Sequence, residues 1–391
     1  MSASTRSTGP LYLDSSESAD RFLASIASSR VLAIDTEGAS FHRFVDRIYL
    51  LQLSTERRHA IIDPLKVETI AGLGSLLESR DVEVVFHDAD YDLRLLHQDY
   101  GWRVTNIFDT RVAAQLLGIK AFGLAALLER YFDVRLDKKH QRADWSMRPL
   151  PSDMLEYAVQ DTMHLLQLRQ RMRDALEKAG RLGWAREEFD RLEGTRWEAD
   201  DPESAFLKLK GARDLSRREL AILKELVAWR NGVAAELDRS TFRVAANDVL
   251  FQLARDVPTT RAGLEGVKGL SRSLLGRQGD AILAAIARGQ AVPDSALPKF
   301  PRGPRWARDP EYEARVTRLK AARDRRAAEL DMDPGVLCPR ERLEAIARRN
   351  PTEVEELAEL TEVRKWQVEV LGEHLIAALR NGVAVESPYR E

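Results

Sequence analysis

The C-terminal half of the chain contains an internal repeat, which restricts the possible folds more than any other sequence feature. Residues 227–285 align without gaps on residues 320–378, and the letters AAELD at 234–238 recur at 327–331. Beyond about residue 205 the apolar residues recur at helical spacing. Apolar and turn positions shared over such a length predict two copies of one small helical domain.

Breaks in the pattern mark the domain boundaries. Residues 291–309 contain Pro293, Pro298, Pro301 and Pro304, which predict a semi-rigid linker between the two copies. A chain of 391 residues should form two or three domains. We expect the following divisions: a flexible N-terminus over 1–18, a first domain over 19–200, one helical copy over 205–290, the linker over 291–309 and the second helical copy over 310–386.

In the first 200 residues, strand-like and helix-like stretches alternate. Strand-like runs at 31–34, 48–53 and 60–62 are close enough in sequence to form an antiparallel meander. Two further runs, 84–86 and 104–108, are each followed by a helix-like stretch. This order predicts a mixed sheet with helices on its faces.

The first of these strands ends in two carboxylates. Asp35 and Glu37 follow the apolar run 31–34, and side chains two apart on a strand share a face. Like charges side by side in a protein interior repel each other and are costly to desolvate, so they normally persist only with a cation between them. A hard divalent metal such as Mg²⁺ or Mn²⁺ suits such oxygen ligands. The alternative is a strand end whose acids simply face water.

A second group of acids lies where the run 84–86 passes into a helix. Asp88, Asp90 and Asp92 follow one another there, and Asp88 is a candidate helix cap. Ligands of open α/β sheets bind at strand-to-helix junctions, so one of these acids could reach the same place as Asp35. The spacing does not select among them, and all three could instead complement the helix dipole.

A tyrosine and an aspartate complete the set. Tyr157 and Asp161 stand four apart on the segment 153–173, whose apolar residues have helical spacing, so the two share a helix face. A carboxylate there can hold a metal ion while the phenol orients an attacking water. Taken alone, Tyr157 could equally be a half-buried packing residue with a satisfied hydroxyl.

In this order the residues resemble a known superfamily. The Asp-x-Glu pair, then His87 with an aspartate five residues later, then Tyr-x-x-x-Asp, is similar to the three motifs of the DEDD exonucleases in their tyrosine-bearing branch. Residues 144–150, DWSMRPL, resemble a signature of the ribonuclease D family and its eukaryotic exosome relatives. Each helical copy resembles an HRDC domain. The resemblance implies an α/β RNase H-like catalytic domain with a mixed sheet, followed by two all-α HRDC domains.

The resemblance also implies roles for individual residues. Asp35, Glu37, Asp92 and Asp161 would hold two Mg²⁺ or Mn²⁺ ions, with Asp35 bridging both, and Tyr157 would position the attacking water. The activity would be that of a metal-dependent 3′–5′ exoribonuclease that releases nucleoside 5′-monophosphates and matures the 3′ ends of transfer RNA. Two alternatives remain: a DNA exonuclease of repair or proofreading, because the same carboxylates hydrolyse either backbone, and a non-catalytic nucleic-acid-binding protein.

The chain departs from the family pattern after the Asp-x-Glu pair. Many members carry a bulky residue there, whereas this chain has Gly38, Ala39 and Ser40. The sequence therefore defines the metal site better than the pocket for the terminal base.

The formal net charge of −2 removes the simplest argument for a nucleic-acid enzyme. Phosphate binding, however, needs only a local basic surface. Lys138, Lys139 and Gln141 lie in a basic run that leads into the DWSMRPL signature, and Trp145 and Arg148 of that signature are further candidate contacts. We expect the partners to be single-stranded RNA 3′ ends and transfer RNA precursors.

Composition agrees with globular modules. Hydrophobic residues make up 44% and charged residues 31%, and no apolar stretch approaches the roughly 20 residues that span a bilayer. The N-terminus lacks the apolar core of a signal peptide, and the single cysteine, Cys338, excludes an intrachain disulfide. We expect a cytoplasmic, monomeric protein without membrane association.

The two helical copies differ at one turn. The first has Gly266, Lys268 and Gly269 just before a helix, where backbone amides and a lysine could meet a phosphate. The second has Glu359 and Glu362 in place of the two glycines. Two acids would repel a phosphate, so we hypothesise that the first copy contacts RNA and the second mainly packs. The alternative is a plain helix-to-helix turn in both copies.

This hypothesis predicts that Lys268→Glu weakens RNA binding. Loss of one phosphate contact should lower the slope of log affinity against log salt concentration by about 1. The measurement is RNA affinity across a range of salt concentrations. An unchanged affinity and slope would show that the turn does not touch RNA.

Overall fold

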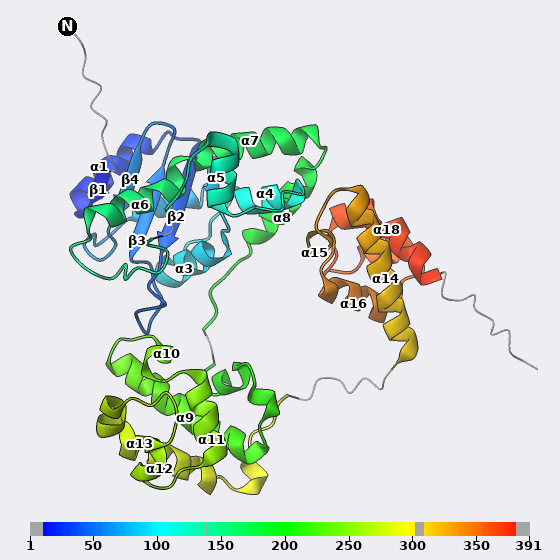
Figure 1. Cartoon of the computed structure of the whole chain (residues 1–391). Coiled ribbons are helices and arrows are strands. Elements are labelled where there is room, and N and C mark those ends of the chain that lie inside the picture. The colour runs from blue at the N-terminus through cyan, green and yellow to red at the C-terminus, as the bar shows by residue number, and fades with distance from the viewer. Residues whose placement is uncertain (1–10, 138, 200, 302–308, 381–391) are drawn as a thin grey trace, which may run out of the picture.

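The computed structural model describes residues 11–137, 139–199, 201–301 and 309–380. Lys138, one of the predicted RNA contacts, lies outside these residues. An α/β module comes first in the chain and is followed by two separate helical modules (Figure 1). Among the described residues, no helix combines the length and the apolar character needed to cross a membrane.

A six-stranded sheet forms the centre of the α/β module, in the order β1-β4-β3-β2-β5-β6. Its strands are β1 (Leu11–Leu13), β2 (Val31–Glu37), β3 (Leu50–Ser54), β4 (His59–Ile62), β5 (Glu83–Phe86) and β6 (Ile107–Asp109). The strands β2, β3 and β4 form an antiparallel meander, whereas β1, β5 and β6 each run parallel to a neighbour. The predicted mixed sheet is therefore confirmed.

Helices cover both faces of this sheet. They are α1 (Ser16–Ile26), α2 (Ala71–Leu77), α3 (Asp90–Tyr100), α4 (Thr110–Leu116), α5 (Leu124–Phe132), α6 (Ser152–Met163), α7 (Leu165–Lys178) and α8 (Leu182–Leu192). The helices α1, α2 and α3 share a core with Leu32 and Ile34 of β2. On the opposite face α6 packs on Leu50 and Ile61, and α4, α5, α7 and α8 pack around Ala33. Successive β2 residues thus face different helical layers, as alternation along a strand requires.

The predicted N-terminal boundary is wrong. The sequence predicts a flexible segment up to residue 18, but β1 pairs with β4 and Leu13 is buried. Ser15 then caps α1 through a capping box with Ser18. A strand of three residues with one buried side chain is too short for its periodicity to be recognised in the sequence.

Asp109 links the two strand-to-helix junctions of β5 and β6. It caps α4, accepting from the N–H groups of Arg111 and Val112 at the start of that helix. It also accepts from the N–H groups of Asp88 and Ala89, just before α3. The predicted capping role of Asp88 is wrong, because its backbone is left-handed (φ 71°) and its carboxylate pairs with Arg111.

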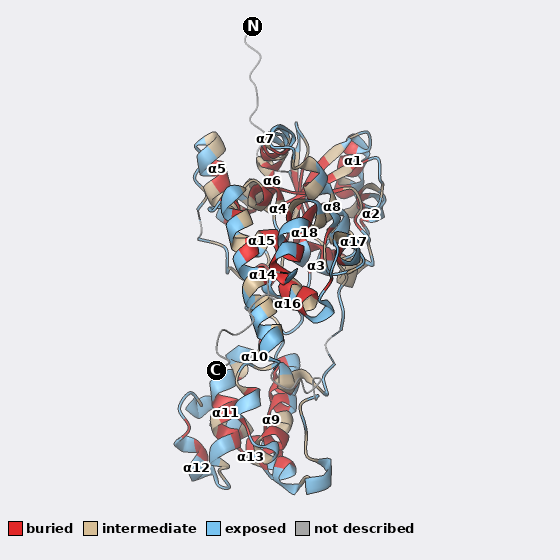
Figure 2. Cartoon of the chain, turned by 90° about the vertical axis from the view of Figure 1, so that its right-hand side faces the viewer, coloured by how far each residue is buried: buried red, intermediate tan, exposed pale blue. Residues whose placement is uncertain are grey.

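The two helical modules repeat the same five helices, which confirms the predicted duplication. The first has α9 (Arg217–Glu236), α10 (Thr241–Val244), α11 (Asn247–Asp256), α12 (Arg261–Glu265) and α13 (Arg272–Ala291); the second has α14 (Pro310–Glu329), α15 (Pro334–Leu337), α16 (Arg340–Arg349), α17 (Val354–Ala358) and α18 (Lys365–Arg380). Short 3₁₀ helices lie at Ala205–Lys208, Ala212–Asp214 and Asp294–Ala296. In the first module α9, α11 and α13 contribute buried residues to one core, and these stretches are red in Figure 2.

The second helical module is docked on α8. Trp366 at the start of α18 is 3% exposed and stacks on Trp184, with ring centroids 5.1 Å apart. Glu187 accepts from the N–H groups of Lys365 and Trp366, and Glu188 accepts from the Trp366 indole. These glutamates therefore satisfy N–H groups that a helix start leaves free, and their charge suits the helix dipole. The second copy therefore packs on the α/β module through α8.

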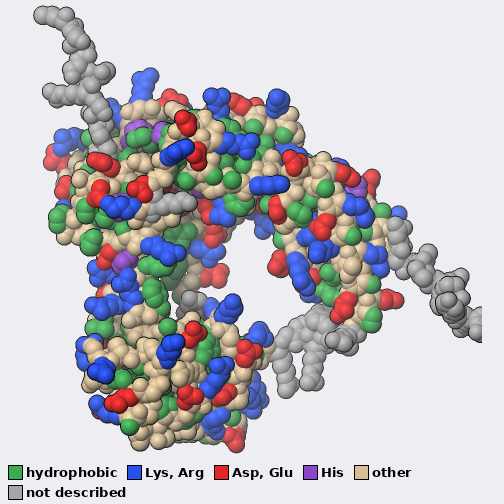
Figure 3. Space-filling model, viewed as in Figure 1, with side chains coloured by type: hydrophobic (Ala, Val, Ile, Leu, Met, Phe, Trp, Pro, Cys, Tyr) green, Lys and Arg blue, Asp and Glu red, His purple; other side chains and the backbone are tan. Residues whose placement is uncertain are grey.

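The first helical module contacts the α/β module through the loop that follows β2. Ser240 and Arg243 both donate to the carbonyl of Phe41, and the ring of Phe41 meets Phe242 edge to face. The carboxylate of Asp238 accepts from the Arg43 side chain. Together with the docked second module, this contact leaves an opening between the three modules (Figure 3).

The docking on α8 predicts a large effect of Trp366→Ala. Removing a buried, stacked indole should lower the free energy of unfolding by about 3–5 kcal/mol. The matched control is Trp197→Ala, because Trp197 is 42% exposed and its loss should change stability by about 0.5 kcal/mol or less. Chemical denaturation followed by circular dichroism measures both variants. Equal losses in the two would contradict the docking.

Candidate active site

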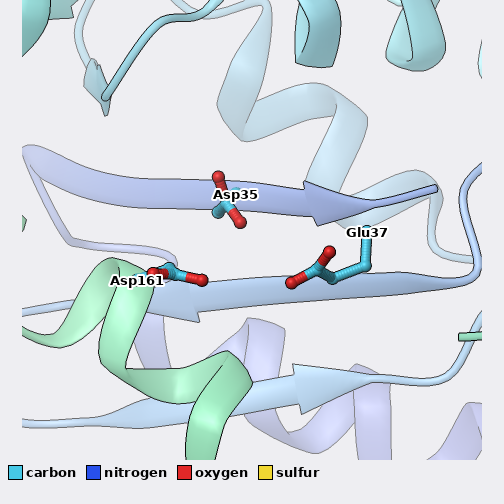
Figure 4. A group of neighbouring side chains, drawn as sticks. All are labelled: Asp35, Glu37 and Asp161. Atoms are coloured by element: carbon cyan, nitrogen blue, oxygen red, sulfur yellow. The ribbon is translucent and has the colours of Figure 1, made fainter. Parts of the chain in front are cut away.

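Three carboxylates from two elements meet on one face of the sheet. Asp35 and Glu37 project from β2, and Asp161 projects from α6 across the same face (Figure 4). One oxygen of each lies within 4.8 Å of the others. The structure therefore brings together the pair predicted from the strand pattern and the acid predicted from helical spacing.

The position of these acids follows from the pairing of β2. Its parallel neighbour β5 pairs only with Val31 to Ala33, whereas β3 pairs from Ala33 to Glu37. The half of β2 that carries the acids therefore has one open edge. This edge lies where the chain turns from β5 into α3, and it gives side chains of α3 access to the site.

Asp92 uses that open edge. It is 5% exposed, and its Oδ1 accepts from the Thr36 N–H at 2.9 Å and from the Thr36 hydroxyl. The carboxylate thus takes the place of the missing β5 partner of β2. Asp92 lies outside the group of three but close enough that its charge raises the pKa of Asp35.

The site is electrostatically strained in the absence of a cation. Burial is the largest cause of the raised pKa of Asp35, and the charges of Asp92, Asp161 and Glu37 add to it. Burial and the charges of Asp161 and Asp92 raise the pKa of Glu37. Burial also raises the pKa of Asp161 to about 7 and that of Asp92 to about 7. Oxygen donors that repel one another in this way fit a hard divalent metal, whose charge would favour their ionised forms. The donor set of this site therefore suits a divalent metal ion.

Tyr157 lies beside the carboxylates, one turn before Asp161 on α6. Its ring packs against His140, with centroids 5.5 Å apart, and against Trp145 at 6.1 Å. Burial raises the pKa of Tyr157, and so do the nearby charges, that of Asp161 first. The phenol therefore stays protonated next to the metal-binding oxygens.

The structure does not present Trp145 and Arg148 to RNA, although the sequence predicts them as RNA contacts. Trp145 is 1% exposed, inside the core under α6. The Arg148 guanidinium is held by both oxygens of Asp63 and by the carbonyl of Tyr49. Buried and paired groups of this kind fix the loop that carries the signature, so we assign them a positioning role in place of a direct contact.

Three of the other predicted nucleic-acid contacts lie among the described residues; all three are exposed, two of them in one loop and the third in the first helical module. Lys139 is on the surface and pairs with Asp153 at 3.0 Å. Gln141 is also exposed in the same loop. Lys268 is exposed in the first helical module, just before α13.

Two residues that support the site were not predicted. Gln52 is buried on β3 opposite Asp35, and its Nε2 donates to Glu37 at 3.5 Å. Thr36 donates to Asp92 from its N–H and its hydroxyl. In the sequence, Gln52 can be noticed as a single amide inside the apolar run 50–53, whereas nothing identifies Thr36 as a partner of Asp92.

The fold and the carboxylate set define a metal-dependent exonuclease domain with helical accessory domains. A family model described as 3′–5′ exonuclease matches residues 11–177, and the HRDC domain model matches 219–286 and 313–379. Ribonuclease D of Granulibacter bethesdensis is 30% identical over 381 residues, covering 97% of this chain and 94% of the relative. The chain belongs to the ribonuclease D family.

Solved structures show the same architecture. Ribonuclease D from Escherichia coli, described as an exoribonuclease involved in structured RNA processing, matches with a TM-score of 0.73 and 24% identity over 96% of this chain and 99% of that one. A protein from Bifidobacterium adolescentis matches with a TM-score of 0.81 and 26% identity over 96% of this chain and 98% of that one. The catalytic domain with two HRDC domains is thus confirmed.

The raised carboxylate pKa values predict that, without metal, the site lowers the stability of the folded protein more at high pH than at low pH. A carboxyl whose pKa is raised by folding stabilises the folded state at pH values below its unfolded pKa of about 4. This contribution is lost as the pH rises through the pKa of the folded state, which is about 7 for Asp92 and Asp161. In chelator, Asp35→Asn should therefore raise the Tm, and the gain should grow from pH 5 to pH 8. Thermal melts of wild type and variant across this range measure the gain.

Added Mg²⁺ should stabilise wild type more than Asp35→Asn, because the ion binds only the folded carboxylates. The control is Asp90→Asn, since Asp90 is exposed and pairs with Arg94 on the surface of α3. A Tm gain at Asp35 that shrinks with rising pH, or that Asp90→Asn reproduces, would contradict the account.

Proposed function

We propose that this protein is a metal-dependent 3′–5′ exoribonuclease that shortens single-stranded RNA ends and releases nucleoside 5′-monophosphates. The observation that carries the proposal is the meeting of Asp35, Glu37 and Asp161 within 4.8 Å, in a domain that matches the exonuclease model. Membership of the ribonuclease D family supports RNA as the substrate and transfer RNA precursors as physiological targets.

The carboxylates of this chain would hold the metal ions, and a tyrosine would orient the attacking water. Bound at this site, two Mg²⁺ or Mn²⁺ ions would activate water and stabilise the leaving 3′ oxygen. Asp35 would help to hold both ions, and Glu37 and Asp161 would hold the ion that activates water. Asp92, already bonded to Thr36, would support the second ion, partly through water.

Tyr157 would orient the attacking water. Its raised pKa keeps the phenol neutral, so it can hydrogen-bond to water without exchanging a proton at neutral pH. Tyr157 stands one turn before Asp161 on α6, where its hydroxyl would reach a water held by the ions.

The open space between the modules suits a single strand. Both helical modules border the opening seen in Figure 3. A strand that enters there would meet the carboxylates through its 3′ end while the first HRDC module holds its upstream phosphates.

The monomeric state and the cytoplasmic location stay predictions of the sequence.

The test uses 5′-labelled single-stranded RNA and DNA of one sequence, each with Mg²⁺, with Mn²⁺ and with chelator. Stepwise shortening of RNA that requires metal is expected, with DNA cut far more slowly. Asp35→Asn should abolish turnover. Preference for DNA would instead indicate a DNA exonuclease, and binding without cleavage would indicate a non-catalytic nucleic-acid-binding protein.

Tyr157→Phe should lower kcat about 10²- to 10⁴-fold with little change in KM, because only the orientation of the water is lost. The matched control is Tyr131→Phe on α5, which removes a hydroxyl from a half-buried tyrosine outside the carboxylate group. Equal kcat values for the two variants would remove Tyr157 from the mechanism.

A further inference from the structure

An exposed aromatic ring lies at the rim of the carboxylate site. Tyr91 precedes Asp92 on α3, and it is 44% exposed although it stands in the first turn of a helix whose other side is buried. Its hydroxyl donates to Oδ2 of Asp46 at 2.7 Å. Asp46 lies in the loop between β2 and β3. The ring therefore lies between the segment that carries Asp92 and the loop that leaves Glu37.

Gly38 makes this position of Tyr91 possible. A Cβ at Gly38 would overlap the Tyr91 hydroxyl, would come within 3.2 Å of Cζ of the same ring and would lie 2.7 Å from Asp46 Oδ1. Gly38 directly follows the metal-binding Glu37. The missing side chain after the Asp-x-Glu pair thus leaves a space, and the phenol of Tyr91 fills it from the second motif.

The loop that holds the hydroxyl is itself fixed along α3. Gln98 donates to the carbonyl of Asp46 at 2.7 Å, and Asp99 accepts from the Ile48 N–H at 2.7 Å. Tyr91 is therefore held at its hydroxyl end by a loop that has two further hydrogen bonds to the same helix. A ring held in this way loses little freedom when a ligand packs on it.

The Tyr91 hydroxyl is engaged by Asp46 and lies against Gly38, so the ring is the part of the side chain that a ligand can pack on. The ring is adjacent in sequence to Asp92 and touches the backbone position that follows Glu37, so it lies beside the carboxylates where hydrolysis would occur.

We propose that Tyr91 is the stacking platform for the base of the 3′-terminal nucleotide. The proposal rests on the proposed function, because it assigns a binding residue to the same site. Stacking on an aromatic ring accepts every base, since every base has a π-face, so Tyr91 sets the position of the terminal nucleotide without selecting its sequence.

The test compares two 5′-labelled RNA oligonucleotides that differ only at the 3′ end, one with a terminal adenosine and one with a terminal ribose that lacks its base. Tyr91→Ala should raise KM for the adenosine end roughly 5- to 150-fold, the range of one lost base stack, and should leave KM for the base-free end unchanged. Tyr91→Phe should stay within about threefold of wild type on both ends, because the ring remains.

Trp197→Ala, at a comparably exposed aromatic outside the site, is the control and should match wild type on both ends. Two results would overturn the proposal: equal losses on both ends for Tyr91→Ala, or a loss in Tyr91→Phe as large as in Tyr91→Ala. Either would show that Tyr91 acts through Asp46 and the loop. A wild-type protein that leaves both RNAs intact with metal present would overturn the proposed function itself.

Discussion

Repulsion among buried carboxylates is the constraint on which this structure depends. Asp35, Glu37, Asp92 and Asp161 each have a raised pKa, and burial is the first cause in every case. The fold holds them together although the metal-free arrangement is unfavourable. Such strain persists only where the surrounding structure fixes it, and it is relieved by a cation. Binding of metal and stability of the folded domain are therefore coupled in this protein.

The open edge of β2 connects this site with the rest of the molecule. Beyond Ala33 the strand has no β5 partner, so α3 can insert Asp92 from one side of the sheet while α6 brings Asp161 to the other. The loop that leaves β2 at Glu37 then reaches the first HRDC module through Phe41. The second module is fixed separately on α8. The metal site and the contact with the first HRDC module thus originate in the same region of the sheet.

Much of the site could be predicted from local patterns. Asp35 and Glu37 follow from strand alternation and Asp161 from helical spacing, and the structure brings all three together. Spacing could not choose Asp92 over Asp90; only the family resemblance did, and the structure buries the first while the second pairs with Arg94 on the surface.

Other features depend on tertiary contacts that no local pattern contains. Trp145 and Arg148 belong to the signature DWSMRPL, but the core under α6 and the carboxylate of Asp63 turn them inward.

Asp35 is the central residue of the proposed metal site, and the most direct test of its role is anomalous diffraction from crystals grown with Mn²⁺ and a nucleoside 5′-monophosphate. Two peaks about 3.5–4 Å apart, both on Asp35, are predicted. A single peak, or none at Asp35, would contradict the two-metal site.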